Sequence, residues 1–125
     1  MMPKLEYFLV AQSIADDKNT NLVSLFHVLE EFSVDELPAT VPSLVAVSSW
    51  LLAEEDQGED FQVTLKICHD DATSLLPDVR VNFTADGLRQ RIYHYVHNLE
   101  LDRPGEIKMF ILLNFTVPSD MAGRK

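Results

Sequence analysis

The chain has 125 residues, a formal net charge of −10 and one cysteine, Cys68. A single domain of this length buries enough surface to fold without disulfides, and a lone cysteine excludes an intrachain bridge. The negative charge repels phosphate groups, so it argues against binding to nucleic acids and to anionic membranes. The N-terminus lacks the apolar core of a signal peptide, and no apolar run reaches the roughly 20 residues that span a bilayer. We therefore expect a cytoplasmic protein with no membrane contact.

The first third of the chain predicts two strands separated by a polar loop. Residues 5–11 are aromatic and aliphatic, which is typical of a strand, whereas residues 12–21 are polar and predict a loop. Residues 21–32 are ambiguous, because their apolar positions fit a helix as well as a strand buried on both faces. A helix would carry Glu30 and Glu31 at its C-terminal end, where negative charge is unfavourable, and no glycine follows as a cap. We favour a strand.

The middle of the chain combines a proline-rich corner with the clearest strand. Residues 33–42 are rich in turn formers, and the capping-box pattern at 33–36 predicts at most one short helical turn. An apolar strand is expected at 43–52, followed by an acidic hairpin loop at 54–60. Residues 61–67 alternate strictly between apolar and polar, so we expect a strand with one buried face.

The last third of the chain repeats this alternation in three segments. They are residues 79–83, 91–101 and 107–115, and glycine-containing turns separate them. About seven strands at regular spacing predict an all-β fold, a single-domain antiparallel β-sandwich of immunoglobulin-like or C2-like type. We place this domain at residues 1–118 and a flexible C-terminal tail at 119–125.

Several of these features recur, in the same order, in a known family. They are the apolar segment at 21–26, the Pro-Ala-Thr-x-Pro corner at 38–42, an apolar strand such as 44–47 and the Pro-Gly turn at 104–105. In these features the chain resembles an uncharacterised family of small bacterial β-sandwich domains. The resemblance supports a strand at 21–32. It implies no catalytic or binding residue, because the family has no assigned activity.

Acidic residues concentrate in three predicted loops, at 12–20, 54–60 and 85–90. If successive strands alternate in direction, these loops gather at one end of the sandwich. Calcium takes six to eight oxygen ligands from such flexible acidic loops. Glu55 and Asp86 would lie beside six candidate calcium ligands. These candidates are Asp16, Asp17, Glu54, Asp56, Glu59 and Asp60. A solvated acidic loop that keeps the protein soluble explains the same residues without a metal, and we favour it.

Tyr93, Tyr95 and His97 alternate along one face of the predicted strand at 91–101. Such a face suits a partner or ligand surface, and it suits equally a half-buried sheet whose phenol oxygens reach water. Leu99 shares this face by parity, which indicates a bulge within the strand. His94 and His97 should lie on opposite faces, so they cannot share a metal ion.

No pattern in the chain indicates catalysis, because it lacks a Gly-x-Ser-x-Gly turn and an activated cysteine, and adjacent acids on a strand point apart. We therefore expect no cofactor and a non-enzymatic interaction module of a bacterial cytoplasmic protein. Its partner would be another protein or a second copy, with an edge strand as the route to a homodimer. The alternative is a calcium-dependent ligand-binding β-sandwich that uses the acidic loops.

Overall fold

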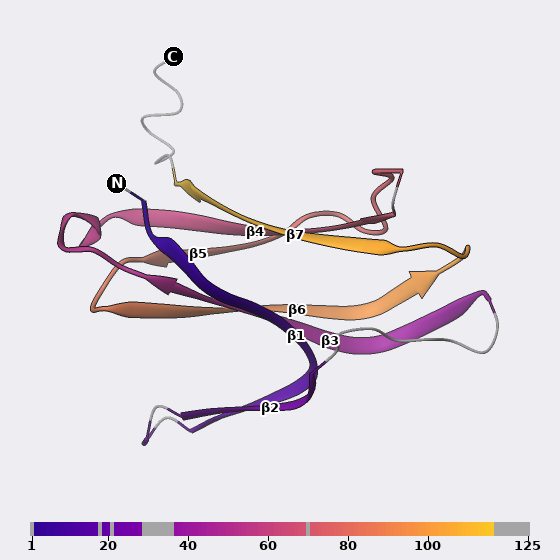
Figure 1. The fold of residues 1–125 in the computed structure, drawn as a ribbon, viewed down its shortest axis with the longest axis horizontal. Helices are drawn as coiled ribbons and strands as arrows, with labels where there is room; N and C mark the ends of the chain where they lie inside the picture. The colour runs from indigo at the N-terminus through magenta and orange to yellow at the C-terminus, as the bar shows by residue number, and fades with distance from the viewer. Residues whose placement is uncertain (1, 18, 21, 29–36, 70, 117–125) are drawn as a thin grey trace, which may run out of the picture.

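The structure is a computed structural model, and it describes residues 2–17, 19–20, 22–28, 37–69 and 71–116. These residues form two antiparallel sheets that pack face to face (Figure 1). Within the described ranges, no helix has the length and apolar character to cross a bilayer. The fold is therefore an all-β sandwich, as the alternating pattern predicted.

The larger sheet contains four strands in the order β2-β1-β3-β6. The strands are β1 (Lys4–Asp17), β2 (Leu22–Val28), β3 (Ala39–Leu51) and β6 (Arg89–Leu101). β3 and β6 pair along their whole length, whereas β1 is divided between two partners. The first half of β1 pairs with β3, and its second half pairs with β2. β2 is thereby attached to the sheet through the far half of β1.

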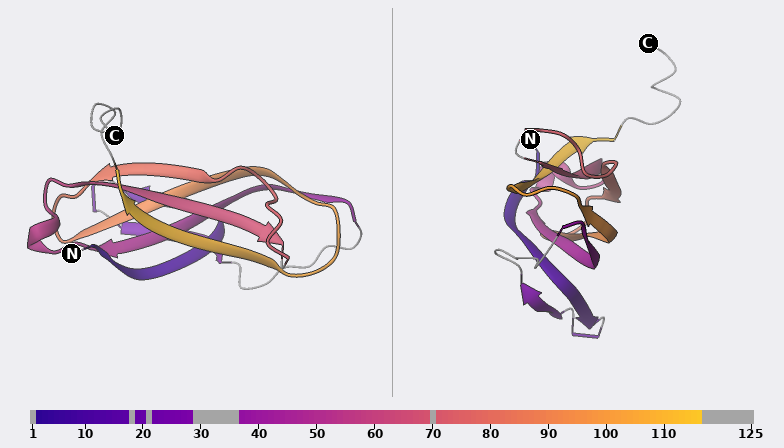
Figure 2. Two further views of the ribbon diagram at one scale, coloured as in Figure 1. Left: turned by 90° about the horizontal axis from the view of Figure 1, so that it is seen from above. Right: turned by 90° about the vertical axis from the view of Figure 1, so that its right-hand side faces the viewer.

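The smaller sheet contains three strands in the order β5-β4-β7. They are β4 (Asp60–His69), β5 (Val79–Thr84) and β7 (Ile107–Phe115), and the 3-10 turn η1 (Glu54–Asp56) precedes β4. The connections β3–β4, β5–β6 and β6–β7 each cross from one sheet to the other, as Figure 2 shows. The predicted hairpin loop at 54–60 is therefore wrong, because this segment links two sheets and does not join neighbouring strands.

Apolar side chains from both sheets fill the space between them. The alternating residues of β4 supply its centre, and Phe61, Val63 and Leu65 are completely buried. Phe61 lies between two other rings of the same sheet, with centroid distances of 5.6 Å to Phe83 and 5.1 Å to Phe115. The strict alternation in the sequence thus correctly predicted one buried face for this strand.

The direction of the side chains changes near the end of β6. Tyr95 and His97 are exposed, but Leu99 packs in the core although its parity is the same. The register with β3 is the same on both sides of this point, so no extra residue is inserted and the predicted bulge is wrong. The change occurs at Asn98, whose φ of 55° lies in the left-handed region. Asn98 is not paired with Pro42, the residue of β3 that lies opposite it in this register. Asparagine tolerates this conformation better than most residues.

Two strand boundaries differ from those expected. Residues 12–17 continue β1 and do not form a loop. Gln12, Ser13 and Ala15 are exposed, while Ile14 packs against buried residues of the larger sheet. β3 begins at Ala39, because its first residues pair with the end of β6. The strand predicted at 21–32 is confirmed over β2. Residues 29–36, with the capping box, and the tail at 119–125 lie outside the described residues.

Candidate functional site

The side chains of β6 that point away from the sandwich core form a candidate binding surface. Tyr93 pairs with Val47 of β3 and Tyr95 pairs with Val45, so these four side chains share the outer face of the larger sheet. The ring centroids of the two tyrosines lie 6.5 Å apart. Tyr95 is 55% exposed, Tyr93 is half-buried and His97 is exposed. We name this surface, made of Tyr7, Leu9, Tyr93, Tyr95 and His97, the tyrosine face.

The floor of the tyrosine face is apolar and closed to water. Ala11, Val45 and Val47 are buried there, although they point away from the smaller sheet. Ile14 and Leu25 pack against these buried residues. Both belong to the two-stranded ribbon that β2 forms with the second half of β1. Figure 1 shows this ribbon on the opposite side of the larger sheet from β4, β5 and β7. The outer face is thus a second, smaller hydrophobic cluster.

An ion pair marks one end of the tyrosine face. The register between β1 and β3 shifts between Leu5 and Tyr7, at Glu6. The Glu6 carboxylate accepts two hydrogen bonds of 2.7 Å from the Arg89 guanidinium and one of 2.8 Å from the Ser49 hydroxyl. These hydrogen bonds, from Arg89 first and Ser49 second, hold the pKa of Glu6 below its usual value. The carboxylate and the guanidinium neutralise each other at this end.

His94 lies on the opposite side of β6, inside the sandwich. It is completely buried, and its Nε2 lies 2.9 Å from the carbonyl oxygen of Val63 on β4. Its Nδ1 has no hydrogen-bond partner among the residues that the structure describes. Burial lowers the pKa of His94, and the hydrogen bond to Val63 offsets part of that effect. The prediction that His94 and His97 occupy opposite faces is confirmed, so the two imidazoles cannot ligate one metal ion.

Two of the acids at 54–60 accept hydrogen bonds from neighbouring residues. The buried carboxylate of Asp56 accepts a 2.8 Å hydrogen bond from the backbone N–H of Ala53, which caps η1. Asp60 accepts a 2.5 Å hydrogen bond from the hydroxyl of Thr84. The other acids of this segment point into water. They are Glu54, Glu55 and Glu59.

Asp16 and Asp17 do not join this group of acids. They are the last two residues of β1, whereas Lys4, its first residue, pairs with Leu51 next to the acidic segment. The expectation that all three acidic loops gather at one end is therefore wrong, because residues 12–17 extend the strand away from that end. Within the described residues, no three histidine, cysteine, aspartate or glutamate side chains come together as a metal site would require. Calcium binding stays a prediction from composition.

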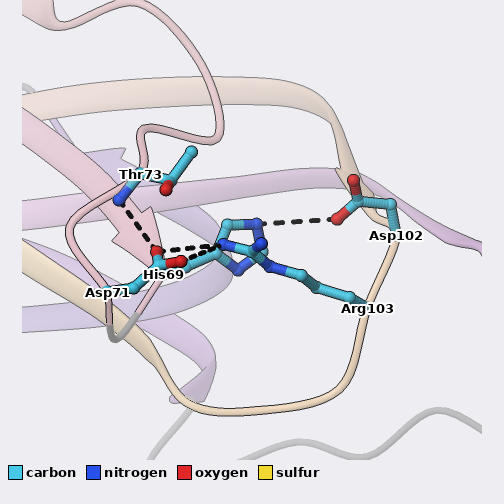
Figure 3. A network of polar contacts seen from close by, with 5 residues as sticks. All are labelled: His69, Asp71, Thr73, Asp102 and Arg103. Atoms are coloured by element: carbon cyan, nitrogen blue, oxygen red, sulfur yellow. Dashed lines mark hydrogen bonds and ion pairs between the residues drawn. The ribbon is translucent and has the colours of Figure 1, made fainter.

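A polar network joins two loops at one end of the sandwich (Figure 3). The Arg103 guanidinium donates to both carboxylate oxygens of Asp71, at 2.9 and 3.0 Å, and the Thr73 backbone N–H donates to the same carboxylate. His69 Nε2 lies 3.5 Å from a carboxylate oxygen of Asp102. Hydrogen bonds from Thr73, followed by the charge of Arg103, lower the pKa of Asp71. The network fastens the β4–β5 loop to the β6–β7 turn.

A family model described as "Family of unknown function (DUF6941)" matches residues 6–117. The chain belongs to DUF6941. The match confirms the resemblance to an uncharacterised family that the proline corner and the Pro-Gly turn indicated. No curated protein and no solved structure matches the chain. The matched range contains nearly all of the sandwich, including the tyrosine face and the polar network, so both surfaces belong to the DUF6941 domain itself.

Sequence reasoning found part of the candidate surface of this DUF6941 domain and missed the rest. Tyr93, Tyr95 and His97 share one face of β6, as predicted, and the pairing with β3 shows that this is the outer face. Tyr7 and Leu9 were missed, because only the pairing of β1 with β3 places them on the same face. The partners of the β4–β5 loop were also missed. They lie about thirty residues further along the chain, and the only local signal was the charged turn that precedes β7.

Proposed function

We propose that this DUF6941 domain is a non-enzymatic interaction module whose contact surface is the tyrosine face. The observation that carries the proposal is the exposed Tyr95 ring, held against Tyr93 above a buried valine floor. Tyrosine is enriched at protein interfaces because its ring contributes apolar area at a low entropic cost while its hydroxyl forms hydrogen bonds. A rigid strand supports both rings, so little ordering is required when a partner binds.

The charges around this surface define the partner. The Glu6–Arg89 pair is internally neutralised, and none of the five residues that make up the tyrosine face is an acid, a lysine or an arginine. The chain as a whole carries a net charge of −10. A basic protein approaches such a chain faster than an acidic one does, and it meets less repulsion once bound. The proposed partner is therefore a basic protein that inserts an apolar side chain beside Tyr95.

We further infer that the domain works in a reducing, cytoplasmic setting. Its one cysteine, Cys68, is a buried free thiol, and small domains of oxidising compartments usually depend on disulfides. The same reasoning from cysteine content supports an intracellular partner.

Tyr95→Ser tests the proposal. Tyr95 is more than half exposed, so the substitution removes the ring without opening the core. Leu88→Ser is the matched control, because Leu88 is an exposed apolar residue in the β5–β6 connection, outside the tyrosine face. Each variant and the unaltered protein would be immobilised, and proteins retained from a cell extract would be quantified by mass spectrometry. The strongest basic candidate would then be purified and its affinity measured by calorimetry.

The expected result is a partner whose affinity falls at least about tenfold with Tyr95→Ser and stays unchanged with Leu88→Ser. Circular dichroism and thermal unfolding would check that both variants fold as the unaltered protein does. Equal affinity of the purified candidate for both variants would refute the tyrosine face as the contact surface. Loss with both variants would point to an interface elsewhere and would count equally against the proposal.

A further inference from the structure

β7 forms one of the two edges of the smaller sheet, whereas the tyrosine face belongs to the larger sheet. β7 is the outermost strand of the order β5-β4-β7, and among the described residues its ladder partner is β4. All nine of its residues pair one to one with β4, from Ile107 opposite His69 to Phe115 opposite Phe61. The register has no shift. In the part of the chain that the structure describes, β7 is therefore a regular edge strand with no strand paired to its second side.

This edge lacks the features that usually prevent strand pairing. Natural edge strands carry prolines, bulges or several charges that block another strand. β7 contains no proline and no glycine, and Lys108 is its only charged residue. Phe110 and Leu112 project from its outer face and are 48% and 44% exposed. β6, one of the two edge strands of the larger sheet, has instead the left-handed residue Asn98 within it.

One hydrogen bond identifies which backbone groups of β7 face away from β4. The N–H of Thr116 donates to the carbonyl oxygen of Asp60 on β4, at 3.0 Å. Backbone groups alternate in direction along a strand, so the even-numbered residues of β7 point toward β4 and the odd-numbered ones point outward. The N–H and C=O groups of Met109, Ile111 and Leu113 therefore face the open side. An incoming strand would pair with these groups.

We propose that β7 pairs antiparallel with β7 of a second copy of this chain, across a two-fold axis through Ile111. In this register the outward groups of Ile111 bond to those of the partner's Ile111, and Met109 pairs with the partner's Leu113. The whole strand forms about ten backbone hydrogen bonds with its copy. Side chains of the outer face meet as the closer, non-hydrogen-bonded pairs, which places Phe110 against the partner's Leu112. The edge is thus complementary to itself.

The charges of β7 itself do not oppose a second copy at this edge. Two chains of net charge −10 repel each other, but β7 contains no acidic residue. In the proposed register Lys108 faces the partner's Asn114, so no like charges are opposed. The two copies of Lys108 lie six residues apart along the ladder, about 20 Å at 3.4 Å per residue, which exceeds the screening length of about 8–10 Å. The two strands would therefore meet along an edge that carries no acidic side chain of its own.

The pairing would join two three-stranded sheets into one continuous sheet across the dimer. The tyrosine face belongs to the other sheet, so each copy keeps it free. The dimer would then present two tyrosine faces to a partner, and binding at both would strengthen the attachment through a high effective concentration. The dimer does not depend on the function proposed for that face.

Paired charge substitutions test both the strand and its register. Phe110→Glu together with Leu112→Glu places a carboxylate opposite a carboxylate of the partner, so it should separate the dimer. Phe110→Glu together with Leu112→Lys places opposite charges across the axis, so it should restore the dimer. Within one chain both positions are exposed and share a face, so neither double variant removes a buried side chain from the core. Thermal unfolding at low concentration would check that the two double variants are equally stable.

Light scattering after size-exclusion chromatography would measure the mass, which is 14.2 kDa for one chain. We expect about twice that mass for the unaltered protein and for the Glu/Lys variant, and the single-chain mass for the Glu/Glu variant. An unaltered protein that stays monomeric at about 1 mM, or a Glu/Glu variant that stays dimeric, would overturn the proposal. Tyr95→Ser should leave the dimer intact, and a monomeric Tyr95→Ser variant would move the interface from β7 to the tyrosine face.

Discussion

Acid should destabilise this domain through His94, and His94→Gln should remove that effect. His94 is completely buried between the sheets, and burial lowers its pKa from the usual 6.5. Below about pH 6.5 the unfolded chain binds a proton at this position that the folded chain excludes, so falling pH favours unfolding. Glutamine does not titrate, and its amide can donate to the carbonyl oxygen of Val63 that His94 now contacts.

The size of the effect follows from one proton. A single group that is protonated only in the unfolded state changes the free energy of unfolding by about 1.4 kcal/mol per pH unit. Between about pH 7.5 and about pH 5.5, an unfolded pKa near 6.5 gives a loss of up to about 1.4 kcal/mol. The loss is smaller if the pKa of the folded state lies within that interval. Stability is therefore retained above pH 6.5 and falls as the pH drops below it.

Urea unfolding at several pH values, followed by fluorescence of Trp50, would measure this dependence. All ionisable groups other than His94 are common to the unaltered protein and to His94→Gln, so the difference between the two proteins isolates His94. The free energies of the two proteins should diverge as the pH falls, with the variant less sensitive to acid. Parallel curves would show that the buried imidazole does not resist protonation, and the reasoning from burial would fail.

Three further predictions concern strain, packing and metal binding. Ala72→Gly should raise the free energy of unfolding by about 0.5–1 kcal/mol, because Ala72 has a φ of 72°, in the left-handed region that favours glycine. Ala53→Gly is the control: Ala53 has a φ of −93°, so glycine there should lower the free energy of unfolding by a similar amount. Urea unfolding measures both changes. Phe61→Ala should cost about 3–5 kcal/mol because it removes a buried ring between two others, and Leu88→Ala at an exposed position should cost less than about 0.5 kcal/mol. Calcium at about 1 mM should leave the unfolding temperature unchanged, because the carboxylate of Asp56 caps η1; a clear rise would revive the calcium hypothesis.

The strands of this fold were predictable because burial imposes a period of two on the sequence. Phe61 and the apolar residues that follow it alternate with polar ones, and the structure buries the former. The assignment of strands to sheets was not predictable in the same way. The acidic segment before Phe61 has the composition of a hairpin loop, yet it crosses between sheets. Turn-forming residues show where a chain reverses, but they do not show which strand it meets next.

The candidate surface shows the same limit at the level of single residues. The parity of Tyr93, Tyr95 and His97 correctly gave them a common face. Parity also placed Leu99 there, because sequence alone does not show that Asn98 adopts a left-handed conformation. Whether the common face points to the core or to water depends on the position of the second sheet. That position is set by contacts between residues far apart in sequence, which no local pattern contains.

The ribbon formed by β2 and the second half of β1 bears on how the tyrosine face can be reached. A two-stranded ribbon is marginally stable alone, so the contacts that Ile14 and Leu25 make beside Val45 and Val47 help hold it in place. Segments with few such contacts open while the rest of a protein stays folded. Each opening would uncover the valine floor. The ribbon would therefore compete with any ligand for Val45 and Val47. Such a ligand must supply enough binding free energy to replace the contacts that the ribbon makes with these two valines.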